Sequence, residues 1–219
     1  LFRRDTATGT AITLISPDAQ RTFATHLGAA VEMRAKDLSQ ETFEGYQIFY
    51  LEGYLITNYD LVDTACRMAT RENMTIAVDL SSYNVVEENR DSFEKIIRSY
   101  ADIVFANEDE ARAFSGMPPA EALDYLSALC EIAVVKTGAN GSILKKAGEI
   151  VQVDAVPVIC NDTTGAGDLY ASGFLYGFAR GASLEQCGKY GSALAARVIE
   201  IPGARMDRER FLQIRNLIN

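Results

Sequence analysis

The segment Asp162-Thr-Thr-Gly-Ala-Gly-Asp168 holds the residue types and spacing best suited to chemistry in this chain. Its two glycines flank an alanine where a loop should become a helix, so the N–H groups of Gly165, Ala166 and Gly167 can approach one anion without side-chain obstruction. A helix N-terminus also carries partial positive charge, which suits a phosphoryl group or an oxyanion. Asp168 follows in the first helical turn, where its carboxylate can accept a proton from an attacking hydroxyl group. The alternative is a glycine-rich turn with Asp168 as an ordinary helix cap, but seven defined positions favour the catalytic interpretation.

Two further segments follow apolar runs that are typical of strands. In Asn107-Glu-Asp-Glu110, an asparagine followed by acidic residues is typical of a helix start, and capping explains it without any function. In Lys136-Thr-Gly-Ala-Asn-Gly141, Gly138 and Gly141 allow close backbone approach to a ligand, although a simple turn would also explain them.

Composition excludes several classes of protein. The 219 residues are 48% hydrophobic and carry a net charge of −9, which argues against a nucleic-acid-binding surface and predicts a soluble, cytoplasmic protein without a membrane span. The four cysteines form no C-x-x-C pair, so we expect reduced thiols. His26 is the only histidine, which makes a Ser-His-Asp triad or a His-rich metal site implausible. No Gly-x4-Gly-Lys-Ser/Thr sequence is present, so a nucleotide site would not be of the P-loop type.

Strands and helices are predicted to alternate after residue 46. Short apolar runs predict buried strands at 47–52, 75–80, 102–106 and 132–137. Helical spacing predicts helices at 58–73, 87–100, 107–115, 120–130, 183–199 and 207–218, and residues 142–146 and 150–153 are typical of a hairpin. The pattern predicts an α/β, doubly wound, mainly parallel sheet with helices on both faces, formed by residues 47–219. Residues 1–46 contain two β-prone runs flanking Pro17-Asp-Ala-Gln20, which predict a small β segment.

These motifs resemble the PfkB family of carbohydrate kinases, which includes ribokinase, fructokinase and adenosine kinase. The 162–168 segment matches the family's C-terminal signature. Thr8-Gly-Thr10, Ser16-Pro-Asp18, Arg21-Thr22 and Leu27-Gly-Ala29 follow the order of its lid strand, so the resemblance covers essentially the whole chain. It implies a ribokinase-like fold and transfer of the ATP γ-phosphoryl group to a primary hydroxymethyl group of a sugar or ribonucleoside. Asp168 would be the general base, and the amides of residues 165–167 would form the anion hole.

The resemblance also implies roles for other residues. Asn107 and Glu110 match an Asn-x-x-Glu motif that organises Mg²⁺ and phosphate through waters, and one carboxylate with one amide is chemically sufficient. The family places ATP against the loop that here contains Lys136, Thr137, Gly138 and Gly141, with Lys136 standing where threonine is more common. Lys136 is expected either to point at a phosphate or to be exposed.

Asp162 and Thr164 match positions that hold a monovalent cation in some members, which allows K⁺ activation, and Thr164 is counted with the cofactor-binding residues. The resemblance also allows a homodimer formed through the lid.

The match departs from the family at the N-terminus. Family members begin with strands that carry an early substrate-contacting aspartate and a Gly-Gly segment, and this sequence has neither, so we expect an N-terminal block to be absent. Two alternatives therefore stay open: a non-catalytic nucleotide- or sugar-binding regulatory protein, and an incomplete kinase fragment. Leu51-Glu-Gly-Tyr-Leu55 and Asp79-Leu-Ser81 lean towards the adenosine-kinase-like branch, while the acceptor itself is not determined.

Overall fold

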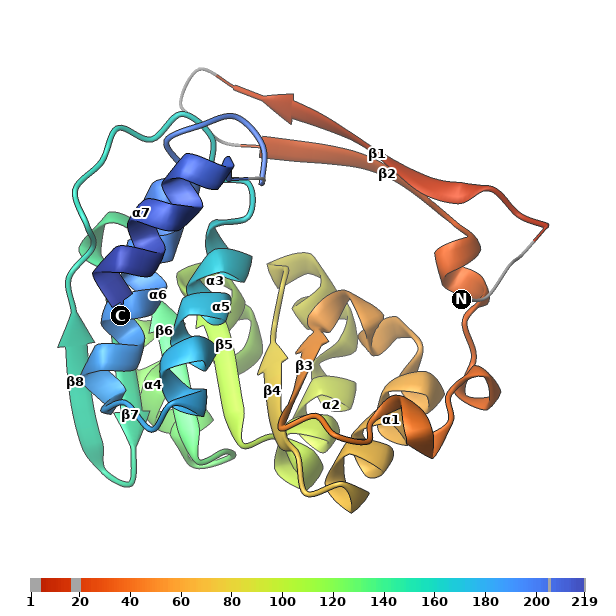
Figure 1. The fold of residues 1–219 in the computed structure, drawn as a ribbon. Helices are drawn as coiled ribbons and strands as arrows, with labels where there is room; N and C mark the ends of the chain where they lie inside the picture. The colour runs from red at the N-terminus through yellow and green to blue at the C-terminus, as the bar shows by residue number, and fades with distance from the viewer. Residues whose placement is uncertain (1–4, 17–20, 205, 219) are drawn as a thin grey trace.

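A six-stranded sheet lies at the centre of the computed structural model, which describes residues 5–16, 21–204 and 206–218 (Figure 1). Its strands are β3 (Ile48–Glu52), β4 (Thr75–Asp79), β5 (Ile103–Asn107), β6 (Ile132–Lys136), β7 (Ser142–Lys146) and β8 (Glu149–Val153). The helices are α1 (Tyr59–Arg71), α2 (Tyr83–Tyr100), α3 (Glu108–Ser115), α4 (Pro119–Ser127), α5 (Ala166–Ala179), α6 (Leu184–Val198) and α7 (Arg208–Ile218). The expected α/β architecture, a mainly parallel sheet with helices on both faces, is confirmed.

The strand order follows the sequence from β3 to β8. The four strands β3 to β6 pair in parallel, whereas β7 and β8 form an antiparallel hairpin that continues the sheet beside β6. Parallel strands must be joined by crossovers, and helices α1 to α4 supply them. All four parallel strands consequently end at the same edge of the sheet, where ligands bind in open α/β folds.

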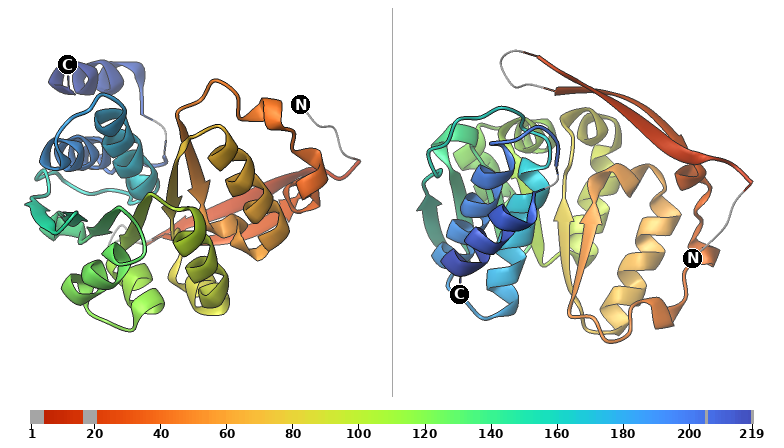
Figure 2. Two further views of the ribbon diagram at one scale, coloured as in Figure 1. Left: turned by 90° about the horizontal axis from the view of Figure 1, so that it is seen from below. Right: turned by 45° about the horizontal axis from the view of Figure 1, so that its top comes forward.

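Each face of the sheet is covered by its own helices. Alternate residues such as Val78 and Val104 pack with α1 to α4 in one apolar cluster. Their neighbours in the strands, such as Ala77 and Phe105, pack with α5 and α6 in a second cluster. Because successive strand residues point to opposite faces, a strand buried on both sides is apolar throughout, which is why these runs were recognisable in the sequence. Figure 2 shows the two helical layers from below and with the top of the molecule tilted toward the viewer.

The segment before the sheet forms a long antiparallel hairpin of β1 (Thr8–Ile15) and β2 (Arg21–Gly28). Figure 1 shows it above the edge at which the parallel strands end. The turn predicted at 17–20 lies outside the described residues. Several apolar side chains of the hairpin are exposed, including Ile12 at 65% and Leu14 at 64%.

Most predicted boundaries agree with the structure to within a few residues, and two helices differ more. Helix α2 begins at Tyr83 rather than at residue 87, and it is kinked at Asn89, where the side-chain amide donates to the carbonyl oxygen of Val85. Helix α4 ends at Ser127 rather than at residue 130. None of the described helices is both long and apolar enough to cross a membrane.

Candidate active site

A row of polar residues ends the four parallel strands. Glu52, Asp79, Asn107 and Lys136 are the last residues of β3, β4, β5 and β6 respectively. Glu52 is in register with Asp79, and Asn107 with Lys136. The alternation of the strands directs these residues to the face that α5 covers, because Ala77, Phe105 and Val134, two positions earlier in their strands, pack against that helix.

Lys136 reaches across β5 to form an ion pair with Asp79 on β4. Its Nζ lies 2.9 Å from Oδ2 of Asp79, and the two side chains are 14% and 5% exposed. Burial lowers the pKa of Lys136, but the carboxylates of Asp79 and Glu110 raise it by more, so the ammonium group stays charged. The expectation that Lys136 would be exposed if it did not contact phosphate was wrong, because the side chain is held inside by Asp79.

Ser81 organises the carboxylates at the ends of β3 and β4. Its N–H donates to Oδ1 of Asp79 at 2.8 Å, and its hydroxyl group donates to Oε2 of Glu52 at 3.0 Å. Ser81 adopts φ = 63°, a conformation that is uncommon for a residue other than glycine. Burial raises the pKa of Glu52, and the Asp168 and Asp79 carboxylates raise it further.

Asn107 and Glu110 form a reciprocal capping box at the start of α3. The Glu110 N–H donates to Oδ1 of Asn107, while Oε2 of Glu110 accepts from the Asn107 N–H at 2.7 Å. The Asn107 side-chain amide also donates to Oε1 of Glu110 at 2.8 Å. The capping interpretation is therefore confirmed.

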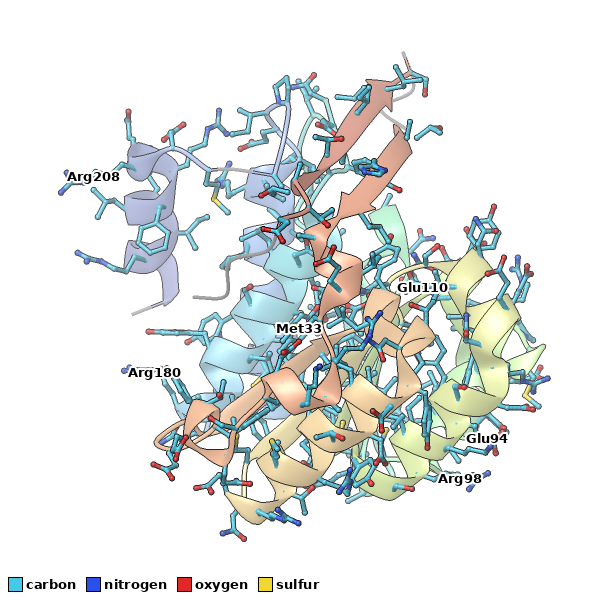
Figure 3. All side chains as sticks on the ribbon, turned by 90° about the vertical axis from the view of Figure 1, so that its right-hand side faces the viewer. Met33, Glu94, Arg98, Glu110, Arg180 and Arg208 are labelled. Atoms are coloured by element: carbon cyan, nitrogen blue, oxygen red, sulfur yellow. The ribbon has the colours of Figure 1, made fainter. Side chains whose placement is uncertain are left out.

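Glu110 is buried although it is ionisable, and burial raises its pKa to about 7 even though Lys136 opposes that shift. A nearby cation would favour its charged form. Figure 3 shows Glu110 at the end of the core that faces the hairpin, whereas Glu94 and Arg98 of α2 lie at the opposite end.

Glycine is required at Gly165, and Gly167 brings the start of α5 close to Lys136. Gly165 adopts φ = 79°, and a Cβ atom there would lie 2.8 Å from Cβ of Ala204. A Cβ atom on Gly167 would lie 3.3 Å from Nζ of Lys136, so the ammonium group is directly beside the first turn of α5.

The first N–H groups of α5 are largely open. The Ala166 N–H donates to the carbonyl oxygen of Thr163 at 3.2 Å. Within the described residues, no backbone carbonyl accepts from the N–H of Gly167 or Asp168, and the Asp168 side chain is exposed.

Asp162 anchors the loop that precedes α5. It is fully buried, and its Oδ1 accepts from the N–H of Thr164 at 2.9 Å and from the Thr164 hydroxyl group at 2.6 Å. Its Oδ2 accepts from the N–H of Gly203 at 2.6 Å. The described residues contain no group of three or more His, Cys, Asp or Glu side chains arranged to hold a metal ion.

The loop from Thr137 to Gly141 lies at the end of β6, immediately after Lys136. The Thr137 N–H donates to the carbonyl oxygen of Gly141 at 2.8 Å, which closes the loop. Gly138 is exposed with φ = 56° and has no neighbour within 4 Å of a Cβ position, so its backbone is open to a ligand. Gly141 has a structural requirement instead, because a Cβ atom there would lie 1.9 Å from the carbonyl oxygen of Val153.

The structure thus brings the predicted site residues to one edge of the sheet, on the loops and helix starts that follow the strands. Asp79 and Glu52 were not predicted as members of this site, because their segments indicated only the branch of the family. A signal was present, because each of four consecutive apolar runs ends in a polar residue.

Comparison with known proteins identifies the family. Residues 2–210 match the model of the pfkB family carbohydrate kinases. An uncharacterized sugar kinase of Archaeoglobus fulgidus is 27% identical over 206 residues, which are 94% of this chain and 82% of the relative.

Two solved structures are similar over 96% of this chain with TM-scores of 0.90: a probable sugar kinase of Rhizobium etli, 34% identical, and the adenosine kinase of Sinorhizobium meliloti, 35% identical. The chain spans 66% of each of these two structures. The match to the family model covers nearly the whole sequence, and the chain belongs to the pfkB family of carbohydrate kinases.

Proposed function

We propose that this chain carries the catalytic core of an ATP-dependent kinase that phosphorylates a primary hydroxymethyl group of a sugar or ribonucleoside. The observation that carries the proposal is the position of Asp168: an exposed carboxylate in the first turn of α5, next to open N–H groups and close to the Lys136 ammonium group. A carboxylate beside an anion site suits proton transfer, and the helix start suits charge on a phosphoryl group.

In the proposed reaction, the acceptor oxygen attacks the γ-phosphorus atom of ATP and loses its proton to Asp168. The bond between the γ-phosphorus atom and the bridging oxygen breaks, and its electron pair leaves with ADP. The N–H groups of residues 165–167 stabilise charge on the transferring group, with Gly167 most open because the Ala166 N–H already has a carbonyl partner. Transfer of this kind depends mainly on position and electrostatics.

We assign the nucleotide to the region between the α5 start and the loop after β6. Gly138 and Gly141 would border the phosphates and ribose, and Thr137 and Thr164 lie in the adjoining loop segments. The open backbone at Gly138 supports this placement. Nucleotide affinity should fall when Gly138 is replaced by valine, because the added side chain would occupy that open space.

Glu110 and Asn107 fit a water-mediated Mg²⁺ site. Glu110 is a buried carboxylate with a raised pKa at the same edge of the sheet, and its two oxygens accept only from Asn107 within the described residues. Mg²⁺ retains several waters and needs few protein ligands. When bound with ATP it would neutralise charge on the phosphates.

A monovalent cation and a lid complete the proposal. Asp162 with Thr164 is the candidate K⁺ site, although both carboxylate oxygens already accept hydrogen bonds within the protein.

Residues 1–46 would act as the lid and 47–219 as the core. The exposed apolar side chains of the hairpin support a role in covering the acceptor or in joining a second copy. Sedimentation velocity of the protein and of Ile12→Ser would distinguish covering of the acceptor from association with a second copy.

The test is ADP release from Mg-ATP with a panel of sugars and ribonucleosides, using the full-length protein. One acceptor should support turnover, and phosphorus NMR of the product should show a phosphomonoester on a primary carbon. ADP release that depends on no acceptor, or binding of ATP without any release, would contradict the proposal and favour a regulatory nucleotide-binding protein.

A further inference from the structure

The ion pair between Lys136 and Asp79 lies immediately behind the start of α5. Lys136 leaves the end of β6, passes over β5 and meets Asp79 at the end of β4, with 2.9 Å between Nζ and Oδ2. The same Nζ is 3.3 Å from a Cβ position on Gly167. The ammonium group is therefore bonded to the end of β4 and lies close to the first turn of α5, which is the proposed anion site.

Lys136 has spare capacity to donate hydrogen bonds. An ammonium group carries three N–H donors, and within the described part of the chain only Asp79 Oδ2 accepts a hydrogen bond from it. A lysine stem is flexible, whereas here the head group is held in one place. A phosphate bound at the N-terminus of α5 would meet a charged donor that is already oriented.

Asp79 is held firmly enough to orient its partner. Its Oδ1 accepts from the N–H of Ser81, and the Ser81 hydroxyl group donates in turn to Glu52. The unusual φ of Ser81 is maintained by these bonds. The lysine is thus oriented by a carboxylate whose own position is determined by the loop after β4.

The charges near the site also require the lysine. Asp79 and Glu110 are both buried behind the proposed phosphate position, and two carboxylates alone would repel a polyphosphate. The Lys136 ammonium group pairs with Asp79 and is near enough to Glu110 to be influenced by its charge, and it offsets part of that repulsion.

We propose that Asp79 is a positioning residue that holds the Lys136 ammonium group beside Gly167, where it donates to a nucleotide phosphate bound at the start of α5. The proposal rests on the proposed function of that helix start as a phosphate site. Asp79 thereby has a role although it does not touch the reacting atoms. The same holds for the ion pair that joins the end of β4 to the end of β6.

The experiment measures equilibrium binding of ADP and of inorganic tripolyphosphate by calorimetry, with the full-length protein. Lys136→Met should weaken both affinities about 10- to 100-fold, as expected for loss of a charged hydrogen bond. Lys136→Arg should retain much of the binding. Asp79→Asn should weaken both ligands in the same direction but less. Lys146→Met is the matched control, because Lys146 pairs with Glu131 on the surface and should leave both affinities unchanged.

The double variant Asp79→Asn/Lys136→Met decides whether Asp79 acts through Lys136. It removes both buried charges and is therefore better tolerated in folding than either single change. Its affinities should equal those of Lys136→Met. The proposal would be overturned if Asp79→Asn bound either ligand more tightly, or if the double variant bound them more weakly than Lys136→Met. It would also be overturned if the single variants lost stability with unchanged affinities, or if the unmodified protein did not bind ADP. Because binding is measured without turnover, ADP binding with this pattern in a protein that transfers no phosphate would contradict only the kinase proposal.

Discussion

The N–H of Gly203 donates a 2.6 Å hydrogen bond to Oδ2 of Asp162, joining the loop before α5 to the loop after α6. The other oxygen of Asp162 accepts from the backbone and side chain of Thr164. One buried carboxylate thereby sets the position from which α5 starts, and the geometry around Asp168 depends on it.

Replacing Asp162 with alanine should lower the free energy of unfolding by about 2–4 kcal/mol, because the partly buried donors of Thr164 and Gly203 lose a charged acceptor. Urea unfolding followed by circular dichroism measures the effect. Asp109→Asn is the control, since its side chain is 72% exposed and should change stability very little. An Asp162→Ala protein as stable as the control would show that the anchor is dispensable.

Replacing Gly165 with alanine should destabilise the protein more than replacing Gly116. Both glycines have nearly the same left-handed backbone, with φ of 79° and 77°, but only at Gly165 does a Cβ position meet another residue, Ala204. The difference between the two variants isolates the clash and should be about 1–3 kcal/mol. Equal unfolding free energies for Gly165→Ala and Gly116→Ala would mean that the 203–204 loop simply moves aside.

Stability should depend on pH through Glu110. Its pKa in the folded protein is about 7 against an ordinary value of 4.5, so the folded state keeps a proton that the unfolded chain releases. Stability therefore falls as pH rises between those two values, and the contribution is fully present only below about pH 4.5.

Urea midpoints for the native protein and Glu110→Gln, measured from pH 4.5 to 7 without divalent cations, test this point. The variant should lose less stability across the interval than the native protein. Parallel curves for the two proteins would exclude a raised pKa at Glu110.

Thiol labelling should distinguish the four cysteines by their surroundings. Cys160 is exposed, whereas Cys66 is buried, and burial raises the pKa of its thiol to about 12. A maleimide at neutral pH should therefore modify Cys160 first and Cys66 only after unfolding, because the thiolate is the reactive form. Peptide mass spectrometry at increasing times gives the order, and equally rapid labelling of Cys66 in the folded protein would contradict the packing of α1.

The elements of the fold were largely predictable because their periodicity is local. The buried strands are continuous apolar runs, and the helices show apolar spacing, so both were identified from the sequence. The start of α2 was not predicted, because Tyr83-Asn-Val-Val86 contains β-branched residues, which disfavour a helix. Burial of Val86 in the apolar cluster beneath α1 to α4 stabilises this first turn.

The site was predictable where it is contiguous in sequence and unpredictable where it is not. The segment 162–168 and the Asn107–Glu110 cap are local motifs, whereas the pairing of Lys136 with Asp79 joins two strands separated by β5. No spacing rule indicates such a partner, since it depends on strand order and on the reach of one side chain.

The most direct test of the account is the turnover of Asp168→Asn with the acceptor identified in the panel. Glu185→Gln is the matched control, because Glu185 is also an exposed carboxylate in the first turn of a helix. It lies away from the site, since α6 starts beside the far end of α5, where Gly177 packs closely against Cys187. We expect Asp168→Asn to lower kcat by about 10²- to 10⁴-fold while ADP affinity is retained. Glu185→Gln should behave as the native protein. Undiminished kcat in a folded Asp168→Asn protein would contradict the assignment of Asp168 as the general base.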